Sequence, residues 1–167
     1  LAAIPGAVVL VAASDGAARS CATGTAMYVS FVPPLVAVAL HPGSRTAVLA
    51  EGSGRFSLSL LGDDQVDLAR RGGRTAGTDD KFDDLGVTVV EGPDGTPAVA
   101  EAQARFWCRV VDAHPAGDHR LVLGQVEAYD RSGIAAPEAR PALLRFLRRY
   151  ASLGRWLTDE TPGGYPT

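Results

Sequence analysis

The chain has 167 residues, 46% of them hydrophobic and 21% charged, and its formal net charge at pH 7 is −3. This length is typical of one domain with a substantial hydrophobic core, so we expect a single domain over residues 1–167. The slightly negative charge and the dispersed arginines argue against a nucleic-acid partner.

Membrane association is also not expected from the sequence. The longest apolar stretch, residues 7–13, is far shorter than the roughly 20 residues that a membrane-spanning helix needs. No signal peptide or lipid-attachment motif is legible, so we expect a cytoplasmic protein with no membrane partner.

Two continuous apolar runs near the start of the chain, residues 8–12 and 35–40, predict buried strands. The first run is followed by Ser14-Asp15-Gly16, which is typical of a hairpin turn. Both strands should therefore lie in the core, with the turn at the surface.

Residues 41–43, His-Pro-Gly, end the second run, and Ser44 is then well placed to cap a short helix over residues 46–51. The strict alternation of residues 56–60 predicts a strand with one buried face, and a further short helix is expected over residues 64–71.

The second half of the chain reads as a loop over residues 72–82, then strands over 87–91, 104–112 and 119–129. Helix-like spacing of apolar residues predicts a helix over 137–154. Six or seven strands with a few short helices, and no alternation of strand and helix, favour a mainly β fold, an antiparallel barrel, over a doubly wound sheet.

Several kinds of site are not supported by the sequence. Cys21 and Cys108 lack the spacing and neighbouring histidines of a zinc site, so we expect buried thiols and no metal. Residues 79–84 lack the ligand spacing of a calcium loop and are expected to form a solvated acidic turn. There is no G-x-S-x-G hydrolase elbow, no G-x-G-x-x-G dinucleotide motif and no Walker loop.

The most informative motif is Gly117-Asp118-His119, at the mouth of the strand that begins with His119. Gly117 allows the positive φ of a sharp turn, and Asp118 favours a turn as well, so the imidazole is held beside a turn. Upstream, residues 21–36 and the triplet Ser44-Arg45-Thr46 supply hydroxyls and a guanidinium suited to a phosphate. On their own, these pieces are more typical of a structural turn, a Thr-rich strand and an ordinary helix cap than of a ligand site.

The order and spacing of many short pieces resemble the flavin reductase-like family, almost from end to end. The pieces are Ile4-Pro5-Gly6-Ala7-Val8-Val9, the Thr-rich stretch, Pro33-Pro34, Ser44-x-Thr46, Phe56-x-Leu58-x-Leu60-Leu61, Gln65, Gly95-x-Pro97, Cys108-Arg109, Gly117-Asp118-His119, Leu143-Leu144 and Tyr150. The chain departs from the family pattern at Gly24, Val32 and Ser59, where Asn or Ser, Asp, and Asn are usual.

The resemblance implies an FMN-binding split β-barrel and an NAD(P)H:flavin oxidoreductase. Hydride would pass from the nicotinamide of NADH or NADPH to FMN or FAD, and reduced flavin would supply a partner monooxygenase. The flavin carries this chemistry, so no acid–base pair is required. Two alternatives stay open: a carrier that holds FMN tightly, and an interaction subunit whose site has decayed.

The resemblance also assigns roles to particular residues. His119 is the candidate catalytic residue, positioning nicotinamide or the flavin edge with support from Asp118. Phe82 matches the family's loop aromatic, which is expected to cover the flavin or the nicotinamide. Residues 23–30 are expected to form a loop around the flavin ring, and Ser44 and Thr46 to contact its phosphate. The candidate cofactor-binding residues are Thr23, Gly24, Thr25, Ala26, Ser30, Ser44, Arg45, Thr46, Phe82, Asp118, His119 and Tyr150.

We also expect a homodimer with flavin sites near the subunit boundary. One barrel of this size offers a groove rather than a closed pocket, and a second copy would close it. The C-terminal segment contains more apolar side chains than a short tail usually hides: Leu143, Leu144, Phe146, Leu147 and Trp156.

Overall fold

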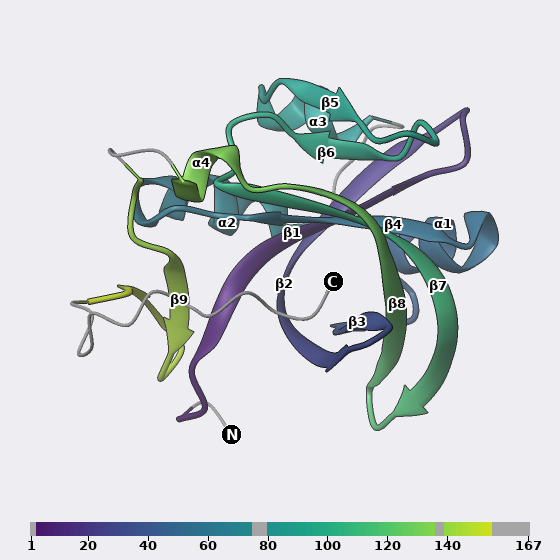
Figure 1. Ribbon diagram of the computed structural model, residues 1–167, viewed down its shortest axis with the longest axis horizontal. Coiled ribbons are helices and arrows are strands. Elements are labelled where there is room, and N and C mark those ends of the chain that lie inside the picture. Colours follow the sequence, from purple (N-terminus) through teal and green to yellow (C-terminus); the bar gives the residue numbers. More distant parts are fainter. Residues whose placement is uncertain (1–2, 75–79, 136–138, 155–167) are drawn as a thin grey trace.

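The computed structural model describes residues 3–74, 80–135 and 139–154, in which mainly β structure is joined by a few short helices (Figure 1). The strands are β1 (Gly6–Ser14), β2 (Arg19–Phe31), β3 (Pro34–Leu40), β4 (Arg55–Leu60), β5 (Val89–Glu91), β6 (Pro97–Val99), β7 (Ala104–Ala116), β8 (His119–Asp130), β9 (Leu143–Phe146) and β10 (Arg149–Ser152). The helices are α1 (Arg45–Ser53), η1 (Asp63–Gln65), α2 (Val66–Gly72), α3 (Lys81–Leu85) and α4 (Ser132–Ala135).

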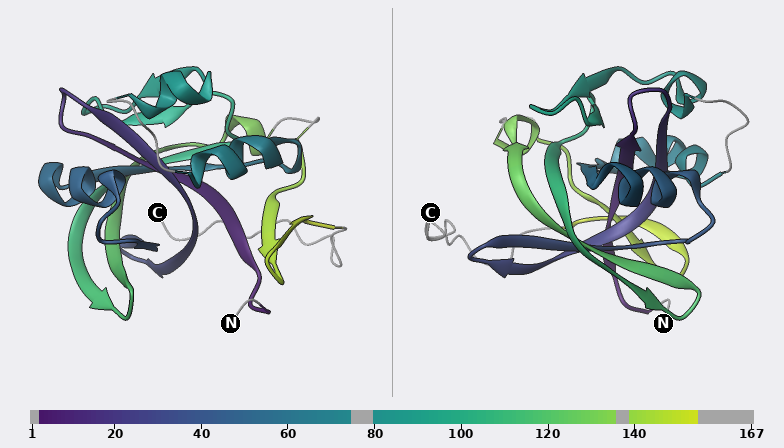
Figure 2. Two further views of the ribbon diagram at one scale, coloured as in Figure 1. Left: turned by 180° about the vertical axis from the view of Figure 1, so that it is seen from behind. Right: turned by 90° about the vertical axis from the view of Figure 1, so that its right-hand side faces the viewer.

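Six strands close into an antiparallel barrel in the order β1-β2-β3-β8-β7-β4, because β4 pairs back with β1. The closing pairs include Val9 with Leu60 and Ala12 with Ser57. The short strands β9 and β10 extend the sheet from the start of β1, and α3 with the β5–β6 hairpin covers one end (Figures 1 and 2). The predicted antiparallel barrel is confirmed.

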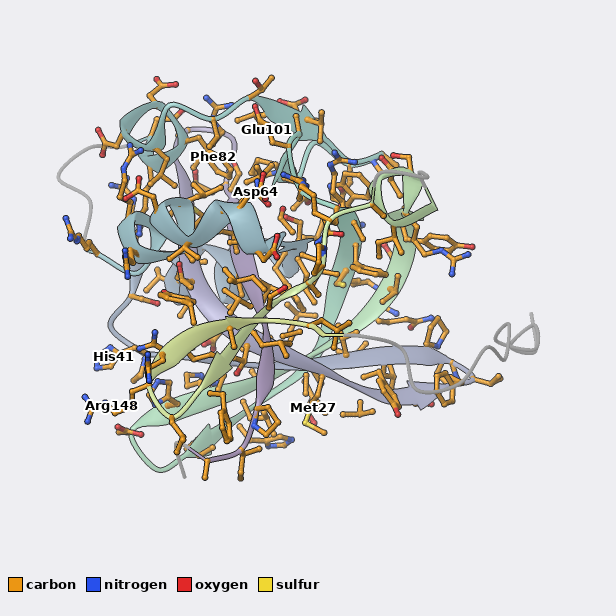
Figure 3. The ribbon with its side chains drawn as sticks, turned by 90° about the vertical axis from the view of Figure 1, so that its left-hand side faces the viewer. Met27, His41, Asp64, Phe82, Glu101 and Arg148 are labelled. Atoms are coloured by element: carbon orange, nitrogen blue, oxygen red, sulfur yellow. The ribbon has the colours of Figure 1, made fainter. Side chains whose placement is uncertain are left out.

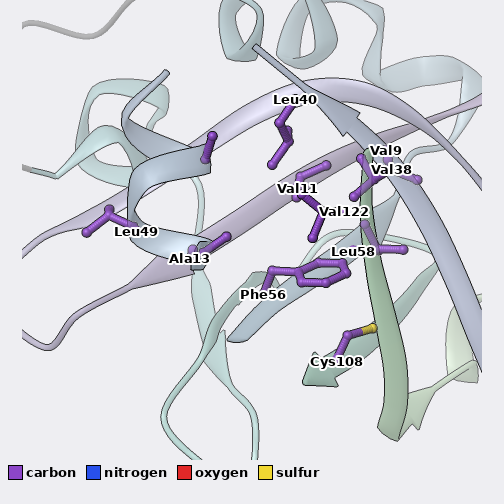
Figure 4. Close-up of a cluster of buried hydrophobic side chains, with 12 residues drawn as sticks. Val9, Val11, Ala13, Val38, Leu40, Leu49, Phe56, Leu58, Cys108 and Val122 are labelled. Atoms are coloured by element: carbon purple, nitrogen blue, oxygen red, sulfur yellow. The ribbon is translucent and has the colours of Figure 1, made fainter. Parts of the chain in front are cut away.

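The barrel interior is filled by one apolar cluster centred on Phe56, Val11 and Val38 (Figure 4). Phe56 needs a glycine opposite it, since a Cβ at Gly124 would lie 2.4 Å from the Phe56 ring. A second cluster lies outside the barrel wall and includes Leu10 and Phe82. Successive residues of β1 alternate between the two clusters, which explains why residues 8–12 form a continuous apolar run.

The prediction that strand β4 has one buried face is wrong, because both of its faces are buried. The Ser57 hydroxyl donates a hydrogen bond to the carbonyl oxygen of Pro97, and the Ser59 hydroxyl accepts one from the Val99 N–H. Ser57 and Ser59 of β4 therefore hold β6 against one face of that strand. The other face carries Phe56 and Leu58 into the barrel core, so the alternation of polar and apolar residues separates two buried faces.

Three other local predictions are wrong. Residues 23–30 are part of strand β2 and not a loop, which agrees with the strand preference of threonine. Residues 143–152 form the β9–β10 hairpin where a helix was predicted. Residues 81–85 form helix α3, capped by Asp80, where an acidic turn was expected.

The expected turn at Gly117 and the expected helix cap at Ser44 are both present. Gly117 has a φ of 66°, and the helix α1 begins after an N-cap at Ser44. Both cysteines are free and buried, and no cluster of potential metal ligands is found in residues 3–74, 80–135 and 139–154. Across the same ranges, no helix is both long enough and apolar enough to cross a bilayer.

Candidate functional site

A cleft of about 450 Å³ lies where strands β2 and β3 meet the start of α1, the end of α2 and the first residue of β8. It continues into a second hollow of about 420 Å³ along β2. Thr23, Ala39, Gly73 and His119 line both, so the two hollows form one groove. Each volume lies within the range usual for small-molecule sites.

One end of the groove is formed by the N-terminus of helix α1. The Ser44 side chain accepts a hydrogen bond from the Ala47 N–H at 3.2 Å, and its extended backbone caps the helix. Arg45 and Thr46 line the same end. The Thr46 hydroxyl lies 3.0 Å from that of Ser20 and is buried, so it braces the helix start from within. The positive end of the helix dipole and a guanidinium here favour an anion.

The floor of the groove is close-packed backbone. The Thr23 hydroxyl donates a hydrogen bond of 2.6 Å to the carbonyl oxygen of Ala69, which ties β2 to α2. Gly72 sits directly against this contact: a Cβ there would lie 2.5 Å from Leu10 Cδ2 and 2.7 Å from Thr23 Oγ1. Gly24 and Thr25 continue the lining into the second hollow. Helix α2 is therefore packed closely against β2 below the groove.

Lys81 fixes the side of the groove that follows α2. Its ammonium donates hydrogen bonds of 2.6 Å to the carbonyl oxygens of Gly72 and Arg74, which lie at and beyond the end of the helix. The side chain is buried, and this desolvation lowers the pKa of Lys81, against the attraction of Cys21 and Asp84. The sequence predicted no role for Lys81 in a site, although it is the only lysine in the chain.

His119 stands at the junction of the two hollows. Its Nδ1 lies 2.8 Å from an Asp118 carboxylate oxygen, and this hydrogen bond lowers the pKa of Asp118. The His41 ring lies edge-on to the His119 ring, with their centroids 6.2 Å apart. Figure 3 shows His41 at the same edge of the molecule as Arg148. From the sequence, we predicted only that the preceding strand ends at His41.

The groove brings together eight of the twelve predicted cofactor-binding residues: Thr23, Gly24, Thr25, Ser44, Arg45, Thr46, His119 and Tyr150. Asp118 lies behind His119 and is exposed. Ala26 packs against the barrel core, and Ser30 lies further along β2, beside the turn to β3. Neither lines the groove.

The prediction that Phe82 covers the flavin is wrong. Its ring is fully buried in the outer apolar cluster, because Asp80 caps α3 and turns the next residues inward. Residues that line the groove but were not predicted include Ser20, His41, Gly72, Gly73, Lys81 and several arginines. These residues come from segments far apart in the sequence, and no local motif marks them.

Comparison with known proteins agrees with this architecture. Residues 1–154 match the flavin reductase like domain family. The reductase component of 4-hydroxyphenylacetate 3-monooxygenase from Thermus thermophilus is 34% identical over 147 residues, which cover 87% of each chain. A probable flavin reductase from Rhizobium meliloti is 33% identical over 129 residues, which cover 76% of this chain but only 40% of that relative.

A solved structure gives the same result. The NADH:FAD oxidoreductase SgcE6 from Streptomyces globisporus superposes with a TM-score of 0.81 at 26% identity, covering 92% of this chain and 89% of the other. The barrel, the groove and the sequence match agree, and the chain belongs to the flavin reductase like domain family.

Proposed function

We propose that this chain is a single-domain NAD(P)H-dependent flavin reductase, which transfers hydride from nicotinamide to FMN or FAD. The observation that carries this proposal is the continuous groove that leads from the N-terminus of α1 to His119. Similar proteins named as flavin reductases and NADH:FAD oxidoreductases support it.

The groove residues fit a flavin. Ser44, Arg45 and the first N–H groups of α1 are suited to a phosphate. Gly24, Thr25 and Gly73 line the second hollow, where we place the flavin ring.

In this proposal, the bound flavin supplies the hydride-accepting chemistry, and the protein orients the two substrates. Asp118 accepts a hydrogen bond from His119 Nδ1, so Nε2 is left for a ligand in the groove. Thr23 ties α2 to β2, and Lys81 ties the end of α2 to α3. Together these hydrogen bonds keep the floor of the groove rigid. Rigid placement of two reactants is itself a large source of rate enhancement.

The test is NADH or NADPH oxidation by the purified protein with and without added flavin. Turnover that requires free FMN or FAD supports a reductase that releases reduced flavin. A yellow protein that holds FMN and does not oxidise either nucleotide would instead be a carrier. A colourless protein that binds no flavin would contradict both.

We further propose a cytoplasmic homodimer that delivers reduced flavin to a monooxygenase. The apolar surface that supports a dimer differs from the expected one. Leu143 is buried by its own barrel, although Phe146 and Leu147 are exposed, and Trp156 lies outside the described residues. The end of the β2–β3 hairpin projects from the barrel (Figure 2). It carries more exposed apolar side chains: Met27, Tyr28, Val29, Phe31 and Val32.

A second copy would cover this hairpin, because monomeric proteins rarely expose so many adjacent apolar side chains. Light scattering of the wild type and of a Tyr28→Ser/Val32→Ser variant tests the dimer. We expect a dimeric mass for the wild type and a monomeric mass for the variant. A fully active wild-type monomer would contradict the proposal.

A further inference from the structure

A third hollow, of about 720 Å³, lies between α2 and the β9–β10 hairpin. Five arginines line it with Tyr150: Arg70, Arg74, Arg145, Arg148 and Arg149. We call this hollow the arginine basin. Arg70, Arg145 and Tyr150 also line the groove beside Thr23, so the basin opens directly into the candidate flavin site.

The basin carries the five positive charges of its arginines. Within the described ranges, none of its five arginines forms an ion pair with a carboxylate. Elsewhere, arginines are paired: Arg19 with Asp80, Arg105 with Asp130, and Arg140 with Asp64. Five unpaired cations at one site are unexpected in a chain with a net charge of −3, unless an anion binds there.

Tyr150 organises part of the basin. The guanidinium carbon of Arg145 lies 4.5 Å from the centre of its ring, and that of Arg70 lies 5.8 Å away. Both distances are within the reach of cation–π attraction. The two cations come from α2 and β9, so the ring holds charges from separate elements together.

The backbone at the tip of the β9–β10 hairpin is strained, which also favours an anion site in the basin. Leu147 and Arg148 have φ values of 49° and 62°, in the left-handed region that Asn and Gly usually occupy in two-residue turns. Side chains larger than these are disfavoured there. Residues held in such a conformation concentrate at ligand sites, where the side chain is needed. Here the side chain that lines the basin is Arg148.

We propose that the arginine basin binds the diphosphate of the nicotinamide dinucleotide substrate, NADH or NADPH. This inference rests on the proposed function for its substrate. Guanidinium groups bind phosphate through paired hydrogen bonds, and several of them suit a diphosphate better than a single phosphate. The phosphate nearest the isoalloxazine is already assigned to Ser44 and Arg45, at the other side of His119. The two phosphates of FAD are directly linked, so its second phosphate stays near Ser44 and does not reach the basin. The nicotinamide dinucleotide is a separate molecule with a diphosphate of its own.

The first experiment measures direct binding of ADP by calorimetry and needs no turnover. We expect the wild type to bind ADP, and the Arg145→Gln/Arg149→Gln variant to bind it at least about 10-fold more weakly. Arg131→Gln is the matched control, because Arg131 is exposed and contacts Tyr129 away from the basin. Absence of ADP binding to the wild type, or equal binding by the double variant, would overturn the proposal.

A second variant separates ligand binding from folding. Arg148→Gly removes a cation and also relieves the left-handed turn. We therefore expect ADP binding to weaken while the melting temperature stays equal or rises. Weaker ADP binding together with a lower melting temperature would assign Arg148 to the fold and count against the basin.

Kinetic measurements then test whether the nicotinamide dinucleotide is the source of the diphosphate. We expect the KM for NADH, with riboflavin as acceptor, to be higher in the double variant than in the wild type. The ratio of kcat/KM for FAD to that for FMN, with NADH held constant, should be the same in both proteins. Weaker ADP binding with an unchanged KM for NADH would overturn the assignment to this substrate. Lack of turnover by the wild type would contradict the proposed function alone, since ADP binding is measured separately.

Discussion

The Nδ1 atom of His119 lies 2.8 Å from a carboxylate oxygen of Asp118, its neighbour in the chain. A carboxylate accepts hydrogen bonds, so Nδ1 carries the proton, and Nε2 remains for the groove. Gly117 makes this arrangement possible, because its positive φ closes the turn that brings both side chains to the start of β8.

We expect His119→Ala to raise the KM for NAD(P)H or to slow hydride transfer, with flavin affinity nearly unchanged. The reason is that His119 opens a strand at the rim, away from the residues assigned to the flavin phosphate. Stopped-flow reduction and flavin titration measure the two effects separately. His114→Ala is the matched control, since His114 forms a similar pair with Asp112, 2.8 Å apart, outside the groove. Unchanged reduction kinetics in His119→Ala would show that His119 has only a structural role.

The phosphate end of the groove is tested by comparing FMN with riboflavin. We expect FMN to bind about 10- to 100-fold more tightly, because a charge-assisted hydrogen bond contributes roughly 1.5–3 kcal/mol. In Arg45→Gln this preference should shrink. Fluorescence titration of both flavins gives the ratio, which is insensitive to any general loss of stability. Equal affinity for FMN and riboflavin in the wild type would count against the assignment.

Gly72 tests whether packing below the groove matters. We expect Gly72→Ala to lower the free energy of unfolding by about 1–3 kcal/mol, because the added methyl would press on Leu10 and Thr23. Gly52→Ala is the control: a Cβ at Gly52, in α1, meets nothing within 4 Å. There the substitution should be neutral or stabilising by up to about 1 kcal/mol. Urea unfolding measures the free energy of unfolding of both variants. Equal values for Gly72→Ala and Gly52→Ala would refute the packing argument.

The buried thiols give a stability change at alkaline pH. Burial raises the pKa of Cys21 to about 11 and that of Cys108 to about 12. The folded state keeps these protons above pH 9, where the unfolded chain begins to release them. Their contribution to stability is therefore complete below about pH 9 and is lost progressively as pH rises toward the folded-state values.

The measurement is urea unfolding at several pH values from about 8 to 11. We expect the free energy of unfolding of the wild type to fall more steeply than that of the Cys21→Ala/Cys108→Ala variant. Parallel curves for the two proteins would contradict the raised pKa values. The variant also controls for tyrosine and lysine residues that titrate in the same range.

Local sequence patterns predicted the elements whose surroundings are simple. The run at residues 8–12 predicted a fully buried strand, and β1 is buried on both faces. Ser44 predicted a helix cap, which the hydrogen bond from Ala47 confirms. In both cases the local preference and the tertiary environment favour the same structure.

The C-terminal hairpin could not be predicted in the same way. Its tip has Leu147 and Arg148 in place of the Asn and Gly that mark two-residue turns, and its apolar spacing resembles that of a helix. Its pairing with β1, between Ala7 and Leu144, is a long-range contact. Tertiary pairing therefore overrode the local pattern.

Only part of the groove could be predicted, because much of its lining depends on tertiary packing. Resemblance to the family identified Ser44 and His119, which line it. Lys81 and the arginine basin depend on how α2, α3 and the hairpin fold together, and no spacing within one segment encodes that. Phe82 was misassigned because a capped helix turned it into the core.

The central claim is hydride transfer from a nicotinamide nucleotide to flavin in this groove. The most direct measurement is anaerobic mixing of the protein with FMN or FAD and then with NADH or NADPH, while flavin absorbance is recorded. The account predicts bleaching of the flavin with stoichiometric oxidation of the nucleotide, much slower in His119→Ala than in His114→Ala. A flavin-saturated wild-type protein that leaves both nucleotides reduced would contradict it.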